Sequence, residues 1–156
     1  MSRAPARLAR VLATWFGCGL VPIAPGTMGS LGAIPLYLLV AMGGRAAVAV
    51  AALVVTAVGV WAGSVVASDL GVEDPQIVVI DEVAGMLVVM LPVAVPSWQA
   101  VVVGFVLFRV LDTLKPWPVS LLEKLPSGWG IVADDVGAGA LGAMAMIGLR
   151  AWHVVP

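Results

Sequence analysis

The sequence predicts an all-α protein, a multi-helix membrane bundle that includes a helical hairpin broken by proline. Hydrophobic residues make up 62% of the 156 residues and charged residues 11%, whereas a soluble domain contains about 45–50% and about 25%. The apolar residues form long runs, and most charges lie between these runs. This composition is typical of a membrane protein, and the length fits a single domain over residues 1–156.

Charge and cysteine content exclude several other classes of protein. The net charge of −1 provides no basic surface for nucleic acid. A single cysteine, Cys18, excludes an internal disulfide framework. Three arginines precede the first apolar residues, as in a signal peptide, but glycines and prolines interrupt residues 17–29. We therefore expect this segment to belong to the mature protein.

Four apolar segments are candidates for membrane helices: Leu31–Met42, Ala46–Ala67, Val83–Phe108 and Val136–Val155. The first segment is short for a full span. Ala46–Ala67 has 22 residues without a charge or a proline, enough to cross about 30 Å of hydrocarbon.

The third segment predicts a helical hairpin rather than one helix. Pro92 and Pro96 flank its middle, and proline interrupts a continuous helix. We expect one arm at Val83–Leu91 and the other at Trp98–Leu114. A straight helix would separate residues 82 and 112 by more than about 40 Å, whereas a hairpin brings them to the same side.

The basic residues indicate the orientation of the bundle. Arginines lie before the first segment, and Lys115 and Lys124 follow the hairpin. Because Lys and Arg are enriched in cytoplasmic loops, we expect the amino terminus and residues 109–135 to face the cytoplasm. All acidic residues then lie on that side. Six of the nine flank apolar runs: Asp81, Glu82, Asp112, Glu123, Asp134 and Asp135.

Four polar stretches lie on this side, and two of them stand at the start of an apolar segment. One is rich in small residues, and the other contains a pair of acidic residues. In Pro25-Gly26-Thr27-Met28-Gly29-Ser30, a Ser or Thr is suited to cap a helix, and the glycines also let backbone N–H groups approach an anion. It is not a P-loop, because Leu31 stands where lysine is required. Asp81-Glu82 precedes the hairpin, where a cap needs only one of the two acids.

The other two stretches add cations and a second acidic pair. Arg109 and Asp112 are three residues apart and share a helical face, so an intrahelical ion pair is the simplest interpretation. Pro116 ends the helix and leaves Lys115 free to reach a phosphate. Asp134-Asp135 stands before the last apolar segment. Each stretch has a structural explanation alone, but four on one side favour a functional site.

These motifs resemble the phosphatidylglycerophosphatase A family, from about Leu12 to Gly139. The resemblance rests on Gly26-Thr27-Met28-Gly29-Ser30, Asp81-Glu82, Phe108-Arg109 with Asp112, Lys115-Pro116-Trp117-Pro118, and Gly130-Ile131 with Asp134-Asp135. It implies a magnesium-dependent phosphatase of the bacterial inner membrane that converts phosphatidylglycerophosphate to phosphatidylglycerol. It also implies an all-helical bundle in which other helices surround a central one.

The chemistry of the residues agrees with this activity. Mg²⁺ prefers oxygen ligands, and carboxylates are the strong ligands this chain offers in number. The expected metal ligands are Asp81, Glu82, Asp134 and Asp135, and the expected catalytic residues are these four with Asp112. The expected substrate-binding residues are Thr27, Gly29, Ser30, Arg109 and Lys115. Attack by water is favoured, and an aspartyl-phosphate intermediate stays open.

Two other classes of function stay open on the residues alone. A divalent-cation transporter also places carboxylates in a membrane bundle, although a lysine and an arginine beside them suit an anion as well. A non-catalytic lipid-binding protein would have no use for paired acids. We expect a phospholipid substrate in the membrane, an active site facing the cytoplasm and no nucleic-acid partner, and the sequence does not predict the oligomeric state.

Overall fold

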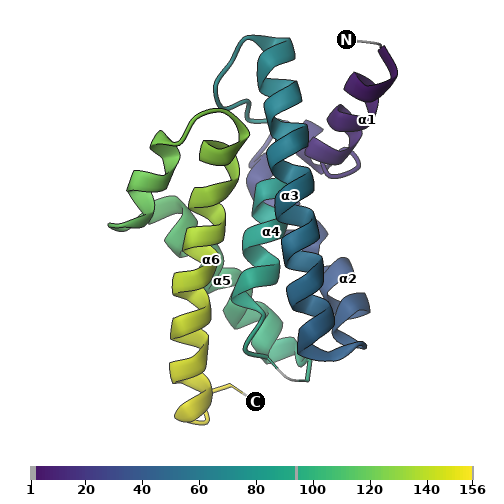
Figure 1. Ribbon diagram of the computed structural model, residues 1–156. Coiled ribbons are helices and arrows are strands. Elements are labelled where there is room, and N and C mark those ends of the chain that lie inside the picture. Colours follow the sequence, from purple (N-terminus) through teal and green to yellow (C-terminus); the bar gives the residue numbers. More distant parts are fainter. Residues whose placement is uncertain (1–2, 94, 156) are drawn as a thin grey trace.

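The computed structural model describes residues 3–93 and 95–155 as a helical bundle (Figure 1). Its elements are α1 (Arg3–Ala13), the 3₁₀ helix η1 (Cys18–Leu20), α2 (Pro25–Ala41), α3 (Gly44–Leu70), α4 (Ile80–Val89), α5 (Trp98–Leu114), the 3₁₀ helix η2 (Val119–Lys124) and α6 (Gly128–Ala151). The all-α prediction is confirmed.

The short helix α4 lies at the centre of the bundle. It contacts α2, α3, α5 and α6, and eight of its residues are buried, Asp81 among them. A helix that is apolar on all sides is stable only when its neighbours cover every face. This arrangement matches the central helix that the family resemblance implied.

The predicted hairpin is confirmed, with small changes at its boundaries. α4 and α5 run in opposite directions, and the described residues between them, 90–93 and 95–97, belong to the turn. The first arm begins at Ile80 instead of Val83, so both acidic residues lie in its first turn, where the helix dipole favours negative charge. The second arm is as predicted. Its first turn is capped by Ser97, whose hydroxyl accepts a hydrogen bond of 3.1 Å from the Ala100 N–H.

Two arginines from other helices fix the turn of the hairpin. Arg45, near the start of α3, donates a hydrogen bond of 3.1 Å to the Pro92 carbonyl. Arg150, near the end of α6, donates to the same oxygen. The start of α3, the end of α6 and the hairpin turn therefore meet at one end of the bundle, opposite the loop that joins α3 to α4 (Figure 1).

The helix α2 begins six residues earlier than predicted. We expected Leu31–Met42, but the helix starts with Pro25, a residue suited to a first helical position. The residue before it, Ala24, makes no side-chain cap, so the expected Ser or Thr cap is wrong. Packing explains the longer helix: a Cβ at Gly29 would lie 2.7 Å from the Cβ of Val79, so the glycine allows close contact with the segment before α4.

Two helices, α3 and α6, are long and apolar enough to cross a membrane, and α2 is a shorter apolar helix. The predicted span Ala46–Ala67 lies within α3, and the fourth apolar segment corresponds to most of α6. Large apolar side chains are exposed on the outer faces of the bundle helices, among them Leu38, Leu39, Val50, Leu53, Val54, Val102, Val106, Met144 and Ile147. Such a surface suits a lipid environment.

Candidate active site

Three carboxylates from two helices converge at one point. The side chains are Asp81 and Glu82 from the first turn of α4 and Asp135 from the second turn of α6, and one oxygen of each lies within 4.8 Å of the others. Asp81 Oδ1 and Glu82 Oε2 are buried without a hydrogen-bond partner among the described residues. Buried like charges this close are unfavourable unless a cation joins them. Oxygen ligands in this arrangement fit a divalent ion such as Mg²⁺.

A close contact between two helices places these carboxylates. A Cβ at Gly139 of α6 would lie 2.5 Å from the Gly85 carbonyl oxygen of α4, so the two backbones touch. Asp81 precedes Gly85 by four residues, and Asp135 precedes Gly139 by four. Residues four apart share a helical face, so both aspartates point towards the helix–helix contact. α4 and α6 also run in the same direction (Figure 1), so both present their positive ends on the side of the site.

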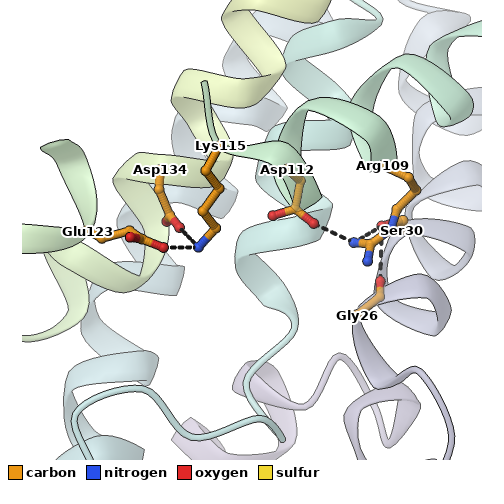
Figure 2. Close-up of polar contacts among 7 residues, drawn as sticks. All are labelled: Gly26, Ser30, Arg109, Asp112, Lys115, Glu123 and Asp134. Carbon is orange, nitrogen blue, oxygen red and sulfur yellow. Dashed lines mark hydrogen bonds and ion pairs between the residues drawn. The ribbon is translucent and has the colours of Figure 1, made fainter. Parts of the chain in front are cut away.

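A guanidinium lies beside the carboxylate cluster. Arg109 Nη1 is 2.8 Å from Asp112 Oδ2, which confirms the ion pair expected from their spacing. Arg109 Nη1 also lies 3.5 Å from Ser30 Oγ, and that hydroxyl donates to the Gly26 carbonyl at 3.0 Å (Figure 2). The carboxylate of Asp112 lies next to that of Asp135. The end of α5 therefore brings a positive and a negative group to the cluster.

The start of α2 closes the opposite side. An ideal Cβ at Gly26 would lie 2.2 Å from Glu82 Oε1 and 3.4 Å from Arg109 Nη1. Only glycine leaves room for both side chains here. Gly26 belongs to a motif that is visible in the sequence, but it is not among the expected site residues. The repeated glycines of that motif were the signal for a close approach.

The predicted anion-binding residues of α2 do not occupy equivalent positions. Thr27 lies in the first helical turn, where backbone N–H groups have no partner within the helix. Gly29 and Ser30 lie one turn later and are buried. Their amides therefore have helical partners, and Ser30 offers its hydroxyl to Arg109 instead. The role of all three residues in phosphate binding stays a prediction.

Lys115 is held by two carboxylates. It ends α5 in a left-handed conformation (φ 42°), which turns its side chain towards α6. Its Nζ lies 2.6 Å from Asp134 Oδ2 and also donates to Glu123 of η2 (Figure 2). Burial lowers the pKa of Lys115, but the hydrogen bonds to Asp134 and Glu123 outweigh it and raise the pKa above its usual value. The expectation that this side chain is free is therefore wrong.

The four predicted metal ligands are divided between two groups. Asp81, Glu82 and Asp135 form the cluster, whereas Asp134 binds Lys115. Neighbouring residues of a helix point about 100° apart, so Asp134 and Asp135 face different neighbours. Glu123 was not assigned to the site. Its contact with Lys115 depends on how η2 folds back on α6, which no local pattern indicates.

Comparison with known proteins agrees with the motifs. The family model described as phosphatidylglycerophosphatase A matches residues 11–150. A phosphatidylglycerophosphatase A of Escherichia coli K12 is 40% identical over 134 residues, covering 85% of this chain and 78% of that protein. One from Haemophilus influenzae is 35% identical over 144 residues, 91% of this chain and 88% of its own.

A third relative carries a different name. It is a protein of Bacteroides thetaiotaomicron that is provisionally named a phosphatidylinositol-3-phosphatase, 36% identical over 159 residues, covering 96% of this chain and 98% of its own. No solved structure matches the chain. The family match and the identity over most of both chains are sufficient: the protein belongs to the phosphatidylglycerophosphatase A family.

Proposed function

We propose that this protein is a magnesium-dependent lipid phosphatase that hydrolyses phosphatidylglycerophosphate to phosphatidylglycerol and inorganic phosphate. Family membership supports a lipid phosphatase of phosphatidylglycerol synthesis. The observation that carries the metal dependence is the convergence of Asp81, Glu82 and Asp135, the first two of them in the first turn of α4. No cation among the described residues neutralises all three.

The metal would be held by these three carboxylates. A bound Mg²⁺ would polarise the phosphoryl oxygens and acidify an attacking water. Of the four ligands expected from the sequence, Asp134 lies outside this group: its Oδ2 binds Lys115, and its Oδ1 is buried without a hydrogen-bond partner among the described residues. We therefore assign Asp134 to positioning Lys115 and not to the metal.

Phosphate recognition falls to Arg109 and the start of α2. The guanidinium is oriented by Asp112 and Ser30, and its remaining N–H donors suit a phosphoryl oxygen. The N–H of Thr27 stands at a helix N-terminus, where anions are stabilised. These groups would offset the negative charge on the equatorial oxygens in the transition state. One carboxylate of the site would accept the proton of the attacking water.

Lys115 is a second candidate for phosphate binding. One of its partners, Asp134, is 7% exposed, whereas Glu123 is 46% exposed. An exposed ion pair contributes little stability, so a substrate phosphate can replace Glu123 at low cost. Lys115 would then join Asp134 to the substrate.

We also propose that the protein lies in the bacterial cytoplasmic membrane with its site open to the cytoplasm. α3 and α6 fit a membrane protein. Arg7, Arg10, Arg109, Lys115 and Lys124 belong to elements at the end of the bundle that holds the site, whereas Arg45 and Arg150 lie at the other end. The greater number of basic residues favours the cytoplasm for the site.

Phosphate release by the purified protein tests this function. The full chain in detergent micelles should release phosphate from phosphatidylglycerophosphate with Mg²⁺ and lose this activity in chelator. Asp135→Asn should need more Mg²⁺ and turn over more slowly, because a neutral amide is a weaker ligand for a hard cation. Full activity in chelator would refute the metal dependence, and no phosphate release under any condition would refute the phosphatase.

A further inference from the structure

The rest of the bundle leaves an apolar face of α1 uncovered. Ala9 and Ala13 are four residues apart and fully buried, and the neighbouring helix is α3. Leu8 and Val11 are three residues apart on another face, and they are 55% and 47% exposed. An uncovered apolar face on a helix favours a partner outside the bundle.

A third face of α1 is basic. Arg7 and Arg10 are three residues apart and both are exposed. Asp69 of α3 lines a small cavity together with Arg10. Within the part of the chain that the structure describes, however, neither arginine forms an ion pair or a side-chain hydrogen bond. Two unpaired guanidinium groups beside an apolar face are typical of a helix that lies in a membrane interface, where its cations meet lipid phosphates.

The position of α1 in the bundle fits this kind of partner. Ala6 and Arg10 share the small cavity with residues of α3 between 65 and 70. α3 has 27 residues, whereas about 20 cross the hydrocarbon layer. If α3 starts at the opposite border, its last turns therefore reach the headgroups. α1 lies at that end of the bundle (Figure 1). The exposed apolar side chains continue after α1 at Phe16, Leu20 and Ile23.

We propose that α1 is an interfacial helix that binds acidic phospholipids of the cytoplasmic leaflet. Arg7 and Arg10 contact the phosphates, and Leu8 and Val11 enter the upper part of the acyl layer. The inference rests on the proposed membrane placement and goes beyond the phosphatase reaction. Acidic lipids are selected because they give the leaflet a negative surface potential, which attracts unpaired arginines, whereas zwitterionic lipids carry no net charge.

Binding of α1 to lipid would also position the active site. The Val79 N–H donates a hydrogen bond of 2.8 Å to the Ala13 carbonyl at the end of α1. Val79 is fully buried and immediately precedes α4. Asp81 and Glu82 follow in the first turn of α4. An α1 that is bound to the leaflet therefore holds the start of α4 close to the lipid layer that carries the substrate.

Hydrogen exchange of the full chain in lipid nanodiscs tests the proposal without turnover. Discs of phosphatidylcholine are compared with discs that also contain phosphatidylserine, an acidic lipid that is neither the proposed substrate nor its product. Each arginine at an acidic surface favours the bound state about 5-fold, so the two should raise the protection of the hydrogen-bonded α1 amides about 30-fold. Salt at about 1 M should abolish this rise.

Variants of α1 separate the contribution of charge from that of apolar contact. Arg10→Gln should reduce the rise to about 5-fold, and Arg7→Gln combined with Arg10→Gln should remove it. Val11→Ser should lower protection in both kinds of disc, because it removes an apolar contact and no charge. Lys124→Gln is the matched control. It removes one exposed positive charge at the same end of the bundle but outside α1, and it should keep the full rise.

Four outcomes would contradict the proposal. Equal protection of α1 in both kinds of disc would overturn the binding of acidic lipid and leave the phosphatase standing. A rise that survives the double arginine substitution would overturn the basic face as its cause. Protection that depends on the number of protein copies in a disc, and not on phosphatidylserine, would assign the uncovered face to a second copy of the chain. Rapid exchange throughout α3 in the discs would refute the membrane placement, and the inference with it.

Discussion

Gly26→Ala adds one methyl group where the start of α2 lies against Glu82. The new Cβ would be 2.2 Å from Glu82 Oε1, and ordinary contact begins at about 3.4 Å. Because the obstacle is the end of a flexible side chain, the backbone can stay in place while the carboxylate moves away by roughly 1 Å. A displacement of that size in a reacting group lowers activity by about 100-fold, or about 2.7 kcal/mol of transition-state stabilisation.

The same substitution should not destabilise the fold. Alanine is preferred to glycine within a helix by about 0.5–1 kcal/mol, so the thermal midpoint of unfolding should stay constant or rise slightly. Phosphate release measured against Mg²⁺ concentration should show a lower kcat and a higher Mg²⁺ requirement. Gly148→Ala is the matched control, since its Cβ would have no atom within 4 Å. A Gly26→Ala enzyme with unchanged kcat/KM and Mg²⁺ requirement would refute a catalytic position for Glu82.

Four further predictions concern other parts of the site. Glu82→Gln should raise the Mg²⁺ concentration for half-maximal activity, and an unchanged titration would exclude this residue as a ligand. Arg109→Ala should lower kcat/KM by about 10²–10³-fold with a smaller loss in Arg109→Lys, measured on the lipid substrate. Gly85→Ala should destabilise the fold by about 1–3 kcal/mol, because its Cβ would lie 2.6 Å from the Asp135 carbonyl oxygen; a normal melting curve would contradict the α4–α6 contact. Glu123→Gln should lower KM by weakening the competitor for Lys115. The raised pKa of Lys115 keeps its ammonium charged throughout pH 6–9, so the effect should be the same across that range, and a Glu123→Gln enzyme with the KM of the unsubstituted protein would argue against Lys115 as a phosphate ligand.

The parts of the fold that local chemistry determines were predicted from the sequence. Pro92 and Pro96 interrupt an apolar run that is otherwise continuous, and the hairpin is where they indicate. The helix α3 was predicted because its long apolar stretch is evident from composition and length alone. The start of α2 was missed because Gly26 and Gly29 weaken a helix in isolation, and only their packing against Glu82 and Val79 explains the helix that forms.

The site was predicted as a set of residues but not as a geometry. Helical spacing was enough for the Arg109–Asp112 pair. Spacing was not enough for the paired acids: Asp81 and Glu82 are neighbours that reach one point, whereas Asp134 contacts Lys115 and only Asp135 joins the cluster. The partners of Lys115 could be predicted only by knowing how the chain reverses at that residue and where η2 runs. Those features depend on tertiary contacts that leave no local signal.

The contact between Arg45 and Pro92 relates the height of the site to the length of α3. That contact places the start of α3 level with the hairpin turn. The heights of α3 and α4 along the bundle can therefore be measured from one plane. At about 1.5 Å per residue, Ile80 lies about 18 Å above it, whereas the end of α3 lies about 38 Å above. The hydrocarbon layer is about 30 Å thick. If the turn lies at the far border of that layer, as the proposed membrane placement would have it, the carboxylates would lie about 10 Å below the near border, and the lipid phosphate would have to descend past the level of its neighbours' headgroups to reach them.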